Sequence, residues 1–266
     1  MKQNAIYLKV AVDMFTAQSL WVLGFLGVMI VVHIFRIVSS LFGDFEVDTY
    51  FNSVFISANI AMFVIGILCF YFLPHFVANG VTRKDYFKGA TLAAIGLSVF
   101  LPIITIVFSV LSQFIINQID GITINNPDIN SVVQDIDTDG NIIGNIISST
   151  VQSFIVPPYI DPNSNWLLAI SIVSINIFIY YLIGWMISSG FYRLGTVPGL
   201  CFVFVGLIIL IAKDSLLRIT LDLPLVEQLK FLDILPKSIA AITVFLLIIM
   251  VIGITRLLTK QVTVKL

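Results

Sequence analysis

Six long apolar runs dominate this sequence, and they restrict the possible folds more than any other feature. A helix of about 20 apolar residues, rising about 1.5 Å per residue, crosses a hydrocarbon core of about 30 Å. Hydrophobic residues make up 59% of the chain and charged residues 11%, whereas soluble domains have about 45–50% and about 25%. We therefore predict an all-α integral membrane protein, a single transmembrane domain over residues 1–266 with six spans at about 20–41, 53–73, 90–116, 166–187, 198–213 and 238–254.

The distribution of charge predicts the orientation of these spans. The segments assigned to the inner side contain nine Lys and Arg residues and two acidic residues, whereas the remaining segments contain 13 acidic and five basic residues. Because cytoplasmic loops of membrane proteins carry an excess of Lys and Arg, both termini are predicted to be cytoplasmic. The loop 43–50 and the excursion 117–165, which has no Lys or Arg, are predicted to be extracytoplasmic.

The N-terminal segment and the spans contain polar residues that need a role. Ile6, Val10 and Met14 recur at helical spacing before the first span, which predicts an amphipathic helix on the inner interface. Lys213 and Asp214 interrupt the fifth apolar run, so we predict that this span ends there. Other in-span polar residues could line a pathway or bond between helices: Asn59, Ser98, Ser109, Gln113, Ser174 and Asn176.

A short basic segment, residues 77–89, connects the second and third apolar runs. Asn79 followed by Gly80 is typical of a helix end. Thr82 followed by Asp85 is typical of a helix start, because the hydroxyl and the carboxylate can each accept from amides of the first turn. The segment is therefore predicted to be a sharp corner with a defined structure.

This corner also combines a basic pair with an aromatic pair. The excess of Lys and Arg inside the cell would by itself account for Arg83 and Lys84. Tyr86 and Phe87, which follow directly, offer the rigid aromatic area that is typical of an anchor in a partner's pocket. We therefore predict that the corner is a docking site for a partner protein.

The segment G-V-T-R-K-D-Y-F-K-G resembles the first cytoplasmic loop of permease subunits of bacterial ATP-binding-cassette exporters, the type-2 class of Gram-positive bacteria. The matching residues are Gly80, Arg83, Lys84, Tyr86, Phe87 and Gly89, and the six-span layout extends the resemblance over most of the chain. The second inner loop, residues 189–199 with Tyr192 and Arg193, is similar to the second inner loop of that family.

The resemblance implies a function and a set of partners. It implies that the corner, from Gly80 through Thr82, Arg83, Lys84, Asp85 and Tyr86 to Phe87, contacts a separate ATPase subunit. That partner would bind ATP and magnesium, and this chain would bind no cofactor. A second permease chain, identical or different, would complete the pathway in the bacterial cell membrane, among its lipids. The substrates would be peptides, antimicrobial compounds or components of the cell envelope.

Several sequence motifs that would indicate other functions are absent. The sequence contains no G-x-x-x-x-G-K-[ST] phosphate loop, so the chain is not expected to hydrolyse ATP. It also lacks H-E-x-x-H and G-x-S-x-G, and we therefore expect no enzyme activity. A net charge of -1 gives no general attraction for nucleic acid. A structural or sensory six-span protein, or an intramembrane enzyme of another kind, stays an alternative.

One segment of the outer excursion matches half of a calcium loop. Asp135, Asp137 and Asp139 alternate before Gly140, which is the pattern that lets carboxylates converge on one ion. The twelfth position holds Ile146 in place of the bidentate Glu, so a solvated acidic turn is the alternative interpretation. Any calcium site here is expected to be weak.

Overall fold

The structure is a computed structural model that describes residues 6–43, 47–119, 122, 124–125, 144, 157–225 and 227–260. Six of its helical segments are long and apolar enough to cross a membrane, which confirms the predicted all-α six-span architecture. The order of elements is α1 (Ile6–Ser40), β1 (Val47–Asp48), α2 (Tyr50–Cys69), α3 (Phe72–Ala78), α4 (Arg83–Ile116), β2 (Ile124–Asn125), α6 (Pro162–Leu194), α7 (Thr196–Leu221), the 3-10 helix η2 (Glu227–Ile234) and α8 (Lys237–Lys260).

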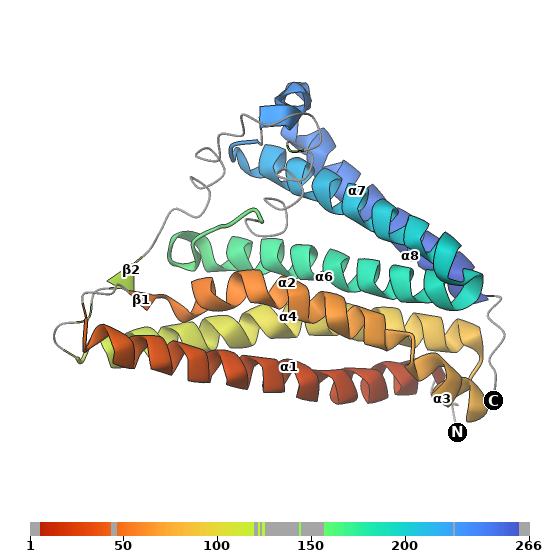
Figure 1. Cartoon of the computed structure of the whole chain (residues 1–266), viewed down its shortest axis with the longest axis horizontal. Coiled ribbons are helices and arrows are strands. Elements are labelled where there is room, and N and C mark those ends of the chain that lie inside the picture. Colours follow the sequence, from red (N-terminus) through yellow and green to blue (C-terminus); the bar gives the residue numbers. More distant parts are fainter. Residues whose placement is uncertain are drawn as a thin grey trace.

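Helix α6 is the centre of the fold. It contacts α2, α4, α7 and α8, while α1 packs along α4. Figure 1 shows α1, α2, α4 and α6 side by side, with α7 and α8 forming a pair that meets α6 at one end and diverges from it toward the other. Both chain ends lie beside α3 at the end where α7 meets α6. An even number of spans requires this arrangement.

The outward faces of the helices are apolar, as lipid contact requires. Phe35 in α1 is 71% exposed and Phe245 in α8 is 57% exposed. Apolar patches of this extent are rare on soluble monomers, but lipid chains cover them in a bilayer. The chain is therefore a multi-pass membrane protein.

Several helix boundaries differ from the predicted span bounds, and three of the differences change the interpretation of the chain. The described part of the expected interfacial helix is continuous with the first span, because Val10 and Met14 are buried and α1 packs along the inner part of α4. The second apolar run is interrupted, since α2 ends at Cys69 and α3 begins at Phe72. The fifth span continues past Lys213 to Leu221.

The connections that are predicted to be extracytoplasmic are only partly described. Strands β1 and β2 form one short parallel pair, in which Val47 faces Ile124. Helix α6 begins at Pro162, inside the predicted excursion 117–165. The candidate calcium ligands Asp135, Asp137 and Asp139 lie outside the described residues. Within the described residues, no group of three or more His, Cys, Asp or Glu side chains could hold a metal ion.

The predicted orientation can be tested with two exposed positions at opposite ends of the helices. Thr82 lies at the corner before α4, and Asn163 lies in the first turn of α6. In a variant without the exposed Cys201, a cysteine at position 163 should react with a membrane-impermeant maleimide in intact cells, whereas a cysteine at position 82 should react only after the cells are broken. Labelling of position 82 in intact cells would contradict the orientation.

Candidate functional site

The candidate site is the corner between α3 and α4, and its first half is a complete helix end. Asn79 caps α3, and its side-chain amide donates to the carbonyl of His75 at 2.8 Å. The amides of Gly80 and Val81 donate to the carbonyls of Val77 and Phe76, both at 3.0 Å, which is the Schellman pattern. Gly80 has a φ of +80°, a conformation that favours glycine. The predicted helix end is confirmed.

The second half of the corner is a capped helix start. The backbone amide of Asp85 donates to the Thr82 hydroxyl at 3.1 Å, and this hydroxyl donates to the Asp85 carboxylate at 2.7 Å. The predicted cap at Thr82 is confirmed. The Asp85 carboxylate was predicted to accept a hydrogen bond from a backbone amide. In the structure it accepts one from the Thr82 hydroxyl. The carboxylate also places a negative charge in the first turn of α4, which stabilises the helix.

The prediction that Tyr86 and Phe87 are exposed anchors is wrong. Tyr86 is 0% exposed and Phe87 is 8% exposed. The Tyr86 hydroxyl donates to the carbonyl of Cys69 at the end of α2, and the Phe87 ring lies 5.2 Å from the Trp185 ring of α6. The physical reason is that α4 begins at Arg83, so both side chains already lie on helix faces that pack inward. They connect the corner to α2 and α6.

The surface that the corner presents is polar and basic. Thr82, Lys84 and Lys88 are exposed, whereas Arg83 and Asp85 are half-buried. The Lys88 ammonium lies 5.5 Å from the ring of Tyr7 in α1. Docking at this corner would therefore depend on its exposed polar groups and its backbone shape. The buried aromatic pair would only support the corner from the side of the core.

The second inner loop and the end of α8 join the same site. Arg193 donates to the carbonyl of Leu257, and the Tyr192 ring lies 4.6 Å from the Phe70 ring. Arg256 donates to the carbonyl of Arg83 at 3.1 Å, and its guanidinium lies 5.1 Å from the Phe87 ring. The structure thus brings together the corner, the α6–α7 connection and the end of α8.

Sequence reasoning did not identify Arg256 as part of this site. In the sequence, Arg256 is only one of the nine basic residues assigned to the inner side. Its 173-position separation from Arg83 hides the contact between them. The clue in the sequence is weak: a basic residue that ends the last span lies on the same side of the membrane as the corner. Only the packing of α8 against α4 and α6 shows the contact.

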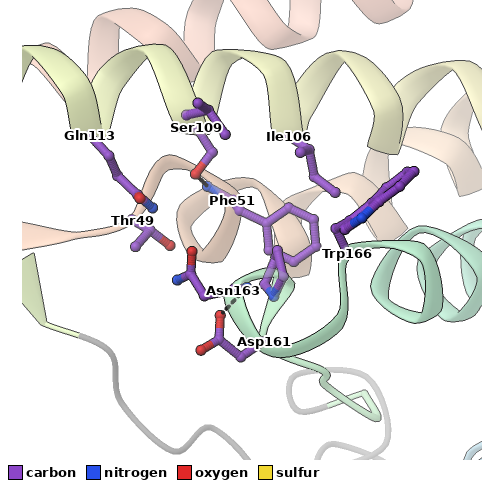
Figure 2. Close-up of a pocket in the computed structure, with 10 residues that line it drawn as sticks. Thr49, Phe51, Ile106, Ser109, Gln113, Asp161, Asn163 and Trp166 are labelled. Atoms are coloured by element: carbon purple, nitrogen blue, oxygen red, sulfur yellow. Dashed lines mark hydrogen bonds between the residues drawn. The ribbon is translucent and has the colours of Figure 1, made fainter.

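A second cluster of polar residues lines a pocket between α2, α4 and α6, at the end of these helices that is predicted to be extracytoplasmic (Figure 2). The pocket has a volume of about 240 Å³, with Phe51 and Trp166 among its walls. Ser109 and Gln113, two of the candidate pathway residues, line it from α4. Asp161 lines the opposite side, and its carboxylate accepts from the amide of Asn163 at 2.9 Å. This carboxylate caps α6, and the Ser109 hydroxyl accepts from the Phe51 amide at 3.4 Å.

A buried hydrogen bond beside this pocket joins the segment before α6 to α2. The Tyr159 hydroxyl donates to the side-chain oxygen of Asn52 in α2. Burial raises the pKa of Tyr159 above its ordinary value. The hydroxyl therefore stays protonated as a donor over the physiological pH range, and the contact is structural.

Comparison with known protein families, with curated proteins and with solved structures found no match to this chain.

Proposed function

We propose that this chain is the membrane-spanning permease subunit of an ATP-binding-cassette exporter of the bacterial cell membrane. A separate ATPase subunit, with its ATP and magnesium, would dock on the corner between α3 and α4, and a second permease chain would complete the pathway. One observation carries the proposal. A capped, exposed corner is attached to the core helices by buried aromatic side chains, so a force applied at the corner reaches the membrane-spanning helices.

The attachment has three described contacts. Tyr86 bonds to the end of α2, Phe87 packs on Trp185 of α6, and Arg256 of α8 bonds to Arg83. These contacts join the corner to three of the membrane-spanning helices, so the corner and those helices would move together. The caps on both helices also reduce the ability of the corner to absorb motion by bending.

The test is retention of an ATPase by the tagged chain purified in mild detergent from the bacterium that carries it. Wild-type chain should retain vanadate-sensitive ATP hydrolysis, and the retained subunit should contain the phosphate-loop motif. Reversing two exposed charges, Lys84→Glu with Lys88→Glu, should reduce the retained activity at least about tenfold, because like charges across an interface repel.

Lys237→Glu is the matched control, since Lys237 is an exposed cation at the opposite end of the helices, paired with Asp222. It should leave the retained activity unchanged. If wild-type chain retains no ATPase, or if the double reversal retains as much as Lys237→Glu, the corner is a structural inner loop and the proposal fails.

A further inference from the structure

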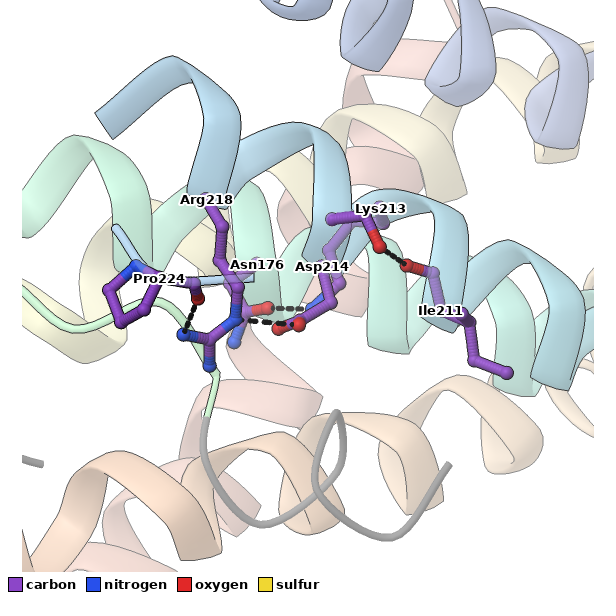
Figure 3. A network of polar contacts seen from close by, with 7 residues as sticks. Asn176, Ile211, Lys213, Asp214, Arg218 and Pro224 are labelled. Carbon is purple, nitrogen blue, oxygen red and sulfur yellow. Dashed lines mark hydrogen bonds and ion pairs between the residues drawn. The ribbon is translucent and has the colours of Figure 1, made fainter. Parts of the chain in front are cut away.

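Three ionisable side chains lie inside the membrane-spanning helix α7 (Figure 3). Lys213, Asp214 and Arg218 are each no more than 1% exposed. The Arg218 side chain donates from Nε to the Asp214 carboxylate at 2.9 Å and from Nη1 to the carbonyl of Pro224 at 3.2 Å. Lys213 is eight residues from the end of α7, so it lies about 12 Å below that end. Charged residues at this depth are costly and usually functional.

Lys213 begins a chain of hydrogen bonds that crosses three helices. Its ammonium donates to the side-chain oxygen of Asn176 in α6, and the Asn176 amide nitrogen donates to the side-chain oxygen of Asn59 in α2 at 2.7 Å. All three side chains are no more than 1% exposed. A polar contact thus joins α7 to α2 and α6, near the middle of both of those helices.

The inner end of α7 is held in a different way. Gly195, with a φ of +85°, makes the sharp turn between α6 and α7. Farther along α7, Gly206 lies close to α6, because a Cβ there would be 2.9 Å from the Ile183 side chain. The bond from Arg193 to the carbonyl of Leu257 holds the end of α8 against the same turn. Beyond this region α7 and α8 diverge from α6 (Figure 1).

We propose that the Lys213–Asn176–Asn59 chain is a latch, which holds the α7–α8 hairpin against the core and releases it to swing about the α6–α7 turn. Both states of such a latch keep their polar groups near partners. After release, Asn176 stays bonded to Asn59, while Lys213 gives up its place over the Tyr180 ring of α6 and stays beside Asp214, its neighbour in α7. Interhelical polar bonds of this kind are weak enough to break and reform.

The inference goes beyond the proposed function, because it requires no ATPase. Release would separate α7 from α6 toward the outer end of the hairpin, where they already diverge. The turn at Gly195 and the close approach of Gly206 to Ile183 would keep the hairpin attached. A hinge at one end and a breakable contact in the middle together form a two-state element.

The test is a distance measurement between spin labels by double electron–electron resonance in lipid nanodiscs. Labels are placed on Phe42→Cys after α1 and on Ser238→Cys at the start of α8, both exposed positions, in a Cys201→Ala background. Lys213→Met should raise the ratio of a longer to the shorter distance about tenfold, which corresponds to 1.4 kcal/mol. Asn176→Leu should do the same. The combined variant should not raise this ratio further, because each change already breaks the Lys213–Asn176 bond.

Two further variants make the result decisive. The Ser215 hydroxyl donates to the carbonyl of Ile211 in the same helix at 3.0 Å, so Ser215→Ala should leave the distances unchanged. Asn176→Asp gives Lys213 a charged partner and should reduce the longer population; it also provides a readout if Lys213→Met fails to fold. Identical distributions for wild type, Lys213→Met and Asn176→Asp would overturn the latch, as would equal broadening by Ser215→Ala.

Discussion

Gly66→Ala and Gly184→Ala are each expected to destabilise the protein by about 3 kcal/mol, at the upper end of the usual cost of overpacking. A Cβ at Gly66 would lie 2.1 Å from the backbone oxygen of Tyr181, and a Cβ at Gly184 would lie 2.2 Å from the backbone oxygen of Phe63. Because the obstructing atoms belong to backbone, no side-chain rotation relieves the clash, and α2 must move away from α6. The measurement is the midpoint of thermal unfolding of the purified protein in detergent.

Gly24→Ala and Gly27→Ala are matched controls in α1. A Cβ at either position would meet nothing within 4 Å, so the change should be neutral or slightly stabilising, since alanine has the higher helix propensity. If all four variants lost similar stability, the loss would be a general effect of replacing glycine with alanine. That result would contradict the close contact of α2 and α6.

Tyr86→Ala is expected to cost about 3–5 kcal/mol of folding stability, the usual range for truncating a large buried aromatic side chain. The variant loses the contacts of the ring with Phe76 and Trp185 and the bond from the hydroxyl to the Cys69 carbonyl. Tyr86→Phe keeps the ring and should cost only about 1 kcal/mol, the net value of one hydrogen bond. Thermal unfolding and the yield of monodisperse protein measure both changes.

The comparison with Lys84→Ala distinguishes a core residue from a docking residue. Lys84 is exposed in the same first turn of α4, so its truncation should leave the unfolding midpoint unchanged. If Tyr86→Ala unfolds at the wild-type temperature, the Tyr86 side chain does not stabilise the core.

The sequence alone predicts the membrane class, the number of spans and the caps of the inner corner. These features depend on local quantities: the length of an apolar run, the φ that glycine tolerates at position 80, and the reach of the Thr82 hydroxyl to an amide three residues away. Local patterns are sufficient here because lipid requires every spanning backbone to satisfy its own hydrogen bonds. The predicted corner and six helices therefore agree with the structure.

Only the tertiary structure decided which side of each helix is buried. Tyr86 and Phe87 follow a basic pair and look exposed in the sequence, yet they pack on α2 and α6. Lys213 and Asp214 look like the end of a span, yet α7 continues because Asn176 of α6 accepts from Lys213 and Arg218 pairs with Asp214. A buried charge depends on partners from other helices, and hydropathy counts only the residue itself.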